Sequence, residues 1–203
     1  MSKLLLVRHG ETELKSSERL WGHTDVKLDA LGLRQAERLR DRLAVEKIDA
    51  IYSSNLQRAL VTAEIIASRH QLGVTACAEL REFNYGKIEG LNHEEIKELY
   101  PEFYKSMMQR SPNLRFPDGE SIGELGNRVN KFMDRLKKHT PEQTILIVAH
   151  FGVLRTLICQ LLSIELGQRW QFYLDLASLS ILETNQQEAK LSLLNDVSHL
   201  DQV

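Results

Sequence analysis

Two short apolar runs that each end in a histidine constrain the fold of this chain more than any other feature. Residues 4–7 (LLLV) lead into Arg8 and His9, and residues 144–150 (TILIVAH) end at the second histidine. Apolar runs of this length between polar flanks are typical of buried strands, and open α/β sheets bind ligands at the carboxyl ends of their strands. Two such strand ends indicate one shared site, although a single histidine at a strand end is more often an ordinary polar residue.

Segments typical of strands and helices alternate along the first part of the chain. Asp29 has the position of an N-cap for a helix with apolar residues on one face, and residues 56–70 predict a second helix. Residues 48–53 and 74–80 are strand candidates between and after these helices. Such alternation favours an α/β fold, with a largely parallel sheet and helices on both of its faces.

A polar and aromatic segment at about residues 84–118 breaks this alternation. It contains Pro101 and Pro112, with a short helical stretch at residues 93–100. We expect the segment to form an excursion that covers the active site.

The strand and helix pattern returns after this segment. Ser121 and Glu124 have the spacing of a capping box, and residues on one face of the helix that follows are apolar. These are Ile122, Leu125, Val129, Phe132 and Leu136. A further helix is expected over residues 153–162, and two strands over 179–183 and 191–194.

Length and charge limit the classes of protein to consider. A chain of 203 residues is most simply one domain, here 1–203. With a formal net charge of −2, the chain has no excess of positive charge for binding nucleic acid or an anionic membrane. Only four apolar residues follow Lys3, and no run approaches the ~20 apolar residues of a membrane span. We therefore expect a cytoplasmic protein with no nucleic-acid or membrane partner, and leave a homodimer open.

The two cysteines are predicted to be buried thiols. Cys77 and Cys159 lie far apart in apolar surroundings, without a CxxC motif. This pattern favours a structural role over a disulfide or a zinc site.

Arg8, His9 and Arg58 are candidates for an anion-binding site. Arg8 and His9 are adjacent, so in an extended strand their side chains would point to opposite faces unless Gly10 breaks the strand. Arg58 lies in the first turn of a predicted helix, where backbone N–H groups favour anions. Its position alone also fits a solvated side chain. Together with Arg8 and the two histidines, it would provide donors that match the oxygens of a phosphate.

Linked motifs then carry a resemblance over nearly the whole chain. In order they are LVRHGETE, GHTDVKLDALGLRQA, YSSNLQRALVTAEIIA, LREFNYGKIEGLN, FPDGESIGELGNRV and VAHFGVLRTLICQLL. The chain resembles the histidine phosphatase superfamily in its phosphoglycerate mutase-like branch. The resemblance implies an α/β fold, a three-layer α/β/α sandwich with a mainly parallel sheet, which agrees with the alternation above.

The resemblance also implies the roles of five residues. His9 would be the nucleophile that becomes phosphorylated, and Glu82 the general acid. Arg8, Arg58 and His150 would hold the phosphoryl oxygens. These residue types suit the chemistry, because a phosphate dianion resists nucleophiles until its oxygens are neutralised.

Further expectations follow from that chemistry. His9 must be neutral, with one ring nitrogen held by an acceptor, and we expect a backbone carbonyl near Gly10 to be that acceptor. Glu82 could give a proton to the leaving alkoxide if burial beside the anionic substrate keeps it protonated near neutral pH. No metal and no cofactor is expected, because the histidines show neither an HxxxH pair nor a nearby Asp cluster.

The chain departs from the family pattern at two positions. Lys15 stands where many relatives have an asparagine that touches the phosphate, and Phe151 stands where many have glycine. Phe151 could stack on a leaving group or exclude one. Trp21 and Gly22 lie in a loop that lines the pocket in such enzymes, with a core role for Trp21 equally open. The expected substrate-binding residues are Arg8, Lys15, Trp21, Gly22, Arg58, His150 and Phe151.

The resemblance favours a phosphatase over a mutase. Phosphoglycerate mutases have a longer excursion between the acid and the second histidine, and a tail that shields phosphohistidine. RFPDGESIGELGNRV, RWQFYLDLASLSILE and LLND resemble alpha-ribazole phosphatases. These enzymes act on alpha-ribazole 5′-phosphate in assembly of the cobalamin nucleotide loop, so this small phosphate ester is the expected substrate.

Other functions stay open at this point. The alternatives are a broad-specificity sugar-phosphate phosphatase, including the fructose 2,6-bisphosphatase type, and a phosphoglycerate mutase. A catalytically inactive binding module is disfavoured, because such a module should have lost at least one of His9, Arg58, Glu82 or His150, and all four are present.

Overall fold

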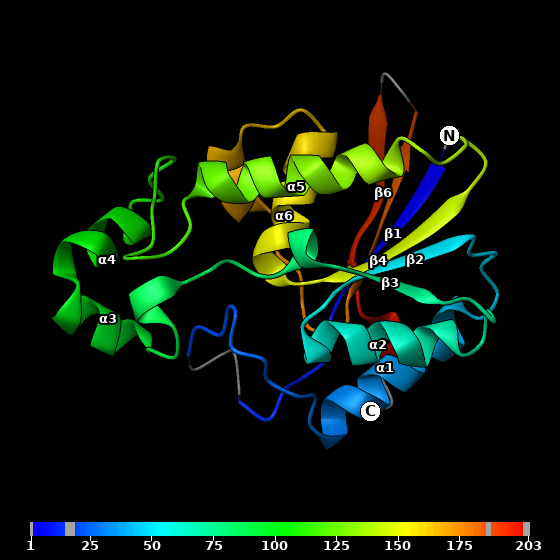
Figure 1. The fold of residues 1–203 in the computed structure, drawn as a ribbon, viewed down its shortest axis with the longest axis horizontal. Coiled ribbons are helices and arrows are strands. Elements are labelled where there is room, and N and C mark those ends of the chain that lie inside the picture. Colours follow the sequence, from blue (N-terminus) through cyan, green and yellow to red (C-terminus); the bar gives the residue numbers. More distant parts are fainter. Residues whose placement is uncertain (1, 15–18, 186–187, 201–203) are drawn as a thin grey trace.

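The computed structural model describes residues 2–14, 19–185 and 188–200, and a six-stranded sheet runs through its centre (Figure 1). The strand order is β3-β2-β4-β1-β5-β6. The strands are β1 (Ser2–Arg8), β2 (Ala50–Ser54), β3 (Val74–Cys77), β4 (Thr144–Ala149), β5 (Leu179–Thr184) and β6 (Ala189–Asp196). The first four pair in parallel, whereas β5 and β6 are antiparallel to their neighbours. The predicted mainly parallel sheet is confirmed.

Helices cover both faces of the sheet. They are α1 (Ala30–Leu43), α2 (Gln57–Ala67), α3 (His93–Leu99), α4 (Pro101–Met108), α5 (Ile122–Leu136) and α6 (Phe151–Leu161). Figure 1 shows α1 and α2 on one side of the sheet and α5 and α6 on the other. The expected three-layer α/β/α arrangement is therefore confirmed.

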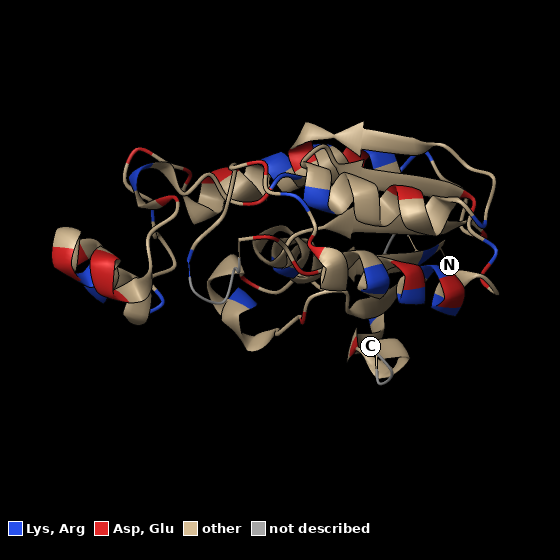
Figure 2. Ribbon diagram, turned by 90° about the horizontal axis from the view of Figure 1, so that it is seen from below, with Lys and Arg blue, Asp and Glu red and all other residues tan. Residues whose placement is uncertain are grey.

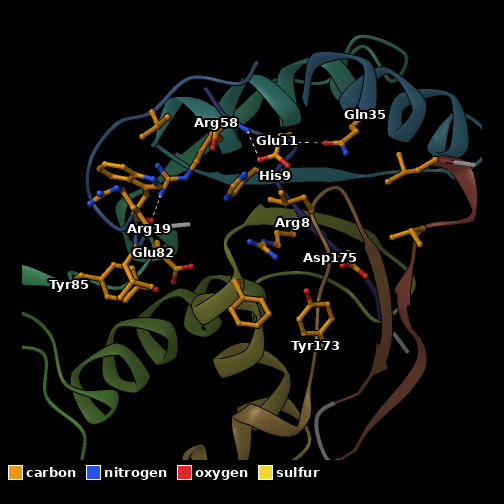
Figure 3. A pocket seen from close by; sticks show the side chains of 18 residues that line it. Arg8, His9, Glu11, Arg19, Gln35, Arg58, Glu82, Tyr85, Tyr173 and Asp175 are labelled. Atoms are coloured by element: carbon orange, nitrogen blue, oxygen red, sulfur yellow. Dashed lines mark hydrogen bonds between the residues drawn. The ribbon is translucent and has the colours of Figure 1, made fainter. Parts of the chain in front are cut away.

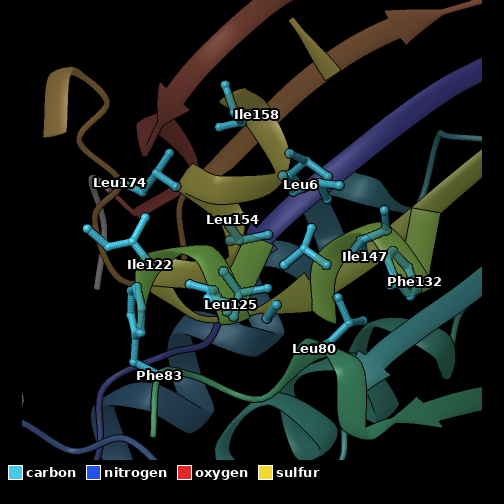
Figure 4. Close-up of a cluster of buried hydrophobic side chains, with 14 of the residues drawn as sticks. Leu6, Leu80, Phe83, Ile122, Leu125, Phe132, Ile147, Leu154, Ile158 and Leu174 are labelled. Carbon is cyan, nitrogen blue, oxygen red and sulfur yellow. The ribbon is translucent and has the colours of Figure 1, made fainter. Parts of the chain in front are cut away.

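The central strand β1 is buried on both of its faces. Leu4 and Leu6 pack with the helices α5 and α6 in one apolar cluster (Figure 4), and Leu5 and Val7 pack with α1 and α2 in another. Successive side chains of a strand point to opposite faces. A strand between two helical layers therefore needs a continuous apolar run, which is the pattern of residues 4–7.

Local signals set the ends of the two long helices. The Asp29 carboxylate accepts a hydrogen bond from the Gly32 amide at 2.7 Å, which caps α1 as expected. Ser121 and Glu124 form the predicted capping box at the start of α5. The apolar face of α5 packs into the core, with Leu136 half-buried at its end.

The bounds of several elements differ from the predicted ones, and one helix was not predicted. The strand predicted at 74–80 ends at Cys77, because its partner β2 ends opposite it at Ser54; a 3₁₀ turn, Ala78–Leu80, follows. The helix predicted at 153–162 begins at Phe151. Helix α4 is not among the predicted helices, because proline breaks a helix at interior positions. Proline is in fact tolerated in the first helical turn, where no N–H is needed.

The segment at 84–118 holds α3 and α4. In Figure 1 these helices lie apart from the sheet, beyond one end of α5. Tyr85 from this segment lines the pocket described below. That the segment covers the active site stays a prediction.

The two cysteines are buried, as the sequence predicts. Basic and acidic residues are interspersed along the helices (Figure 2). Cys77 and Cys159 are buried and unbonded. Within residues 2–14, 19–185 and 188–200, no helix is both long and apolar enough to cross a membrane.

Candidate active site

The parallel register of β1 and β4 brings the two histidines together. Arg8 pairs with Ala149 at the carboxyl ends of these neighbouring strands, so His9 and His150 leave the sheet at the same edge. The His9 amide donates to the Ala149 carbonyl at 3.1 Å, and the two imidazole centroids are 5.1 Å apart. The shared site expected from the two strand ends is thus formed.

A pocket of about 610 Å³ opens at this edge of the sheet. Figure 3 shows Arg8, His9 and Arg58 within it, with Glu82 on one side and Tyr173 and Asp175 on the other. The lining therefore combines guanidinium groups, an imidazole, carboxylates and aromatic rings. Lys15, expected in this set, lies outside the described residues.

His9 is buried and held in one tautomer. Its Nδ1 lies 2.8 Å from the Gly10 carbonyl oxygen, which can only accept, so Nδ1 carries the proton and Nε2 keeps a lone pair. This is the carbonyl that the sequence led us to expect. Burial lowers the pKa of His9 well below its usual value, and the charges of Arg58 and Arg8 lower it further. The ring is consequently neutral near pH 7.

Gly10 allows the turn that places His9. A Cβ on Gly10 would lie 2.6 Å from the Gly32 carbonyl oxygen, so the first turn of α1 packs directly against this backbone. A larger residue would push α1 away from the strand end. The glycine therefore permits the close approach of the two backbones.

His150 presents a donor rather than a lone pair. Arg58 Nε donates to its Nδ1 at 3.2 Å, which leaves the proton on Nε2. That Nε2 is buried and has no hydrogen-bond partner among the described residues. Burial, followed by the positive charge of Arg58, lowers the pKa of His150 well below its usual value. The structure therefore favours a neutral His150 that can donate a hydrogen bond from Nε2.

Arg58 is fixed through all three of its guanidinium nitrogens. It lies in the first turn of α2 and is only 2% exposed. Besides the bond to His150, its Nη1 donates to the Thr24 carbonyl at 2.8 Å and its Nη2 to the Gly22 carbonyl at 2.7 Å. Gly22 thus contributes a backbone oxygen to the site, and Trp21 lines the pocket beside it.

Glu82 faces the pocket with its carboxylate held by backbone amides. Phe83 donates to Oε1 at 2.9 Å, and the Gly152 amide lies 3.1 and 3.0 Å from Oε1 and Oε2. Gly152 is in the first turn of α6, where amide groups have no partner within the helix. The second histidine-bearing strand and the helix after it therefore supply both His150 and the support for Glu82.

Arg128 braces the segment that carries Glu82. Its guanidinium donates to the carbonyls of Arg81 and Glu82 at 2.7 and 3.1 Å, and it pairs with Glu120 at 2.8 Å. Sequence reasoning did not assign a role to Arg128 or Glu120. Both lie in the motif FPDGESIGELGNRV, with Glu120 just before the capping box and Arg128 after it. This spacing was the one sign in the sequence that they could pair.

Other lining residues were also missed as site residues. Tyr85 follows Glu82 in LREFNYG, and Tyr173 and Asp175 lie in RWQFYLDLASLSILE. Each is within a motif, but nothing local marks it as facing a pocket. Phe151, which was expected, lines the pocket next to Arg8.

This arrangement can bind a tetrahedral anion and attack it. Arg8, Arg58 and the Nε2–H of His150 offer donors, while the His9 Nε2 lone pair is available as a nucleophile. Glu82 can exchange a proton on the side opposite Asp175 (Figure 3). Among the described residues, no three His, Cys, Asp or Glu side chains are grouped so as to hold a metal ion.

Known proteins resemble this chain over nearly its whole length. The sequence model described as the histidine phosphatase superfamily (branch 1) matches residues 4–197. Phosphoserine phosphatase 1 of Hydrogenobacter thermophilus is 34% identical over 98% of this chain and 95% of its own length. The adenosylcobalamin/alpha-ribazole phosphatase of Escherichia coli is 33% identical over 95% of each. The crystal structure of the alpha-ribazole phosphatase from Shigella flexneri covers 96% of each chain, with 33% identity and a TM-score of 0.88.

Proposed function

Since the chain belongs to the histidine phosphatase superfamily (branch 1) and is an enzyme that hydrolyses phosphate esters, we propose that it acts through a phosphohistidine formed on His9. The observation that carries this proposal is the protonation state of His9. Its Nδ1–H bonds the Gly10 carbonyl and its pKa is lowered by burial. The Nε2 lone pair is therefore available at neutral pH, between two guanidinium groups that attract the substrate.

In the first step, His9 Nε2 attacks phosphorus and the bond from phosphorus to the ester oxygen breaks. Arg8, Arg58 and the Nε2–H of His150 stabilise the charge on the non-bridging oxygens. Glu82, in its protonated form, gives its proton to the leaving alkoxide, which departs as an alcohol.

The second step regenerates the enzyme. The Glu82 carboxylate takes a proton from a water molecule, and the water oxygen attacks the phosphorus of phosphohistidine. The P–N bond breaks, inorganic phosphate is released, and His9 recovers its lone pair. One carboxyl group can serve both steps because the leaving oxygen and the attacking water occupy the same side of the phosphorus.

We propose alpha-ribazole 5′-phosphate as the substrate. The pocket, at about 610 Å³, has room for a leaving group much larger than a three-carbon unit, within the usual range of roughly 300–1,000 Å³ for small-molecule sites. Its walls include Trp21, Tyr85, Phe151 and Tyr173, which suit an aromatic base. Relatives named alpha-ribazole phosphatase match in both sequence and structure.

Phosphoserine is the second candidate. Asp175 places a carboxylate in the pocket, and its Oδ2 accepts a hydrogen bond from Asn195 Nδ2 at 2.8 Å. A carboxylate fixed in this way could pair with the ammonium group of an amino acid. A relative named phosphoserine phosphatase matches over nearly the full chain.

Steady-state kinetics on a substrate panel tests this assignment. The panel contains alpha-ribazole 5′-phosphate, O-phosphoserine, fructose 2,6-bisphosphate and 3-phosphoglycerate, with His9→Ala as the control for contaminating phosphatases. We expect the highest kcat/KM on alpha-ribazole 5′-phosphate. A higher value on phosphoserine, together with its loss in Asp175→Asn, would establish the second candidate instead.

A further inference from the structure

The two arginines of the pocket are held in different ways. All three guanidinium nitrogens of Arg58 donate to protein acceptors. Arg8 donates through Nη1 to the Leu174 carbonyl at 2.7 Å, and its buried Nε has no hydrogen-bond partner in the described part of the chain. A single hydrogen bond does not by itself set the plane of the guanidinium. The contacts of Arg8 with its buried neighbours must set it.

The ring of Phe151 provides such a contact. The Arg8 Cζ lies over this ring, 4.9 Å from its centroid, and the Arg155 Cζ lies 4.5 Å from the same centroid. The ring edge meets Tyr173 at a centroid distance of 5.8 Å and an interplanar angle of 71°. Phe151 is thus in contact with two guanidinium groups and one aromatic ring.

The backbone and Arg155 keep the Phe151 ring in place. Phe151 is the first residue of α6 and Arg155 is one helical turn later, so their side chains lie on the same face of the helix. Arg155 is itself anchored, because its Nε donates to the Arg169 carbonyl at 2.6 Å. The ring therefore forms a rigid surface against which the Arg8 side chain rests.

An aromatic ring holds a guanidinium differently from a hydrogen-bond acceptor. The attraction is between the cation and the negative face of the ring, and it uses none of the five N–H donors. Arg8 can be restrained by Phe151 and still direct its remaining in-plane N–H groups at an oxyanion. A carboxylate in the same place would occupy those donors and cancel the positive charge.

We propose that Phe151 is a positioning residue that orients the Arg8 guanidinium toward the phosphoryl group of the substrate. The inference rests on the proposed function, because it takes Arg8 as a ligand of the phosphoryl oxygens. It assigns to Phe151 a role in binding the phosphoryl group, which is separate from contact with the leaving group. The part of its effect that acts through Arg8 should therefore be the same for every phosphate ester.

Competitive inhibition by orthovanadate measures this role without reference to the leaving group. p-Nitrophenyl phosphate serves as the reporter substrate, and Phe151 is replaced by phenylalanines with one, two and three ring fluorines. Fluorination keeps the shape of the ring and weakens its negative face. The inhibition constant should rise with each fluorine, to roughly 5–30-fold in total, the range of a desolvated cation–π contact. A constant that does not change along the series would overturn the inference.

Matched variants separate the ring's electrostatics from packing. The same fluorinated series at Phe103, which packs on Phe116 with centroids 5.4 Å apart, should leave the inhibition constant unchanged. Phe151→Tyr should preserve vanadate binding, whereas Phe151→Leu should weaken it. In an Arg8→Met background, fluorination of Phe151 should have no further effect, because its partner is absent.

The Arg8→Met enzyme also separates this inference from the proposed function. If Arg8→Met binds vanadate as well as the wild type, Arg8 is not a phosphoryl ligand and the proposed function fails at that residue. If Arg8→Met weakens vanadate binding but fluorination of Phe151 does not, only the positioning role is wrong.

Discussion

Replacing Gly152 by alanine should displace the Glu82 carboxyl group and so lower activity, although Glu82 itself is unchanged. A Cβ at position 152 would lie 2.5 Å from Glu82 Oε1 and 2.6 Å from the Phe83 ring. A carbon and an oxygen approach to about 3.3 Å, so the carboxylate has to move by about 0.8 Å. The Gly152 amide that now bonds this carboxylate stays in the helix, so the movement also stretches that hydrogen bond.

The size of the effect follows from this displacement. A misplacement of about 1 Å in a catalytic group costs roughly 10²-fold in rate, so kcat on an alkyl phosphate should fall by roughly 10²-fold. The loss should be smaller on p-nitrophenyl phosphate, whose leaving group needs little protonation. Vanadate binding should stay close to the wild-type value, because Arg8 and Arg58 do not contact position 152.

Kinetics and thermal unfolding of two variants check this reasoning. Overpacking at position 152 should lower the free energy of unfolding by about 1–3 kcal/mol. Gly123→Ala is the control, because no atom lies within 4 Å of its added Cβ; it should stabilise helix α5 by about 0.5–1 kcal/mol with unchanged kinetics. Wild-type kcat in Gly152→Ala, or equal losses on both substrates, would refute the role given to Glu82.

Three further predictions concern the acid, the buried histidines and metal ions. Glu82→Gln should lower kcat by roughly 10²–10⁴-fold on an alkyl phosphate and less on p-nitrophenyl phosphate; equal losses would place the acid elsewhere. Because the pKa values of His9 and His150 are lowered in the folded state, the unfolded chain binds more protons below pH ~6.5, and stability should fall there. Urea unfolding should therefore give a lower free energy of unfolding at pH 5.5 than at pH 8, and His150→Gln should reduce this pH dependence. Activity should survive EDTA, since protein groups supply the donors that a metal would provide; loss with EDTA and recovery with a divalent ion would contradict this.

The strands and helices that carry the site were predictable from local patterns. Residues 4–7 and 145–149 are apolar without alternation because both strands are buried on both faces, and parallel pairing of such strands brings His9 and His150 to one edge. Asp29 and Ser121 mark helix starts because their side chains satisfy exposed amides. These signals depend on neighbours in sequence, so the sequence alone reveals them.

The contacts that hold the site were not predictable, because they join distant segments. Arg128 reaches the carbonyls around Glu82 from another helix, and Phe151 meets Arg8 across the sheet edge. The bond of Gly152 to Glu82 likewise spans two motifs. Helix α4 was not predicted for a local reason: a proline can either end a helix or stand in the first turn of one, and the local sequence does not tell the two apart.

The central claim is that phosphoryl transfer passes through the His9 imidazole. Rapid quenching of a reaction with ³²P-labelled substrate, followed by peptide mapping, tests it most directly. The account predicts a label on His9 that is stable in base and labile in acid, absent in His9→Ala, and more abundant in Glu82→Gln if that variant slows hydrolysis of the intermediate. A label on a serine, or full activity in His9→Ala, would contradict it.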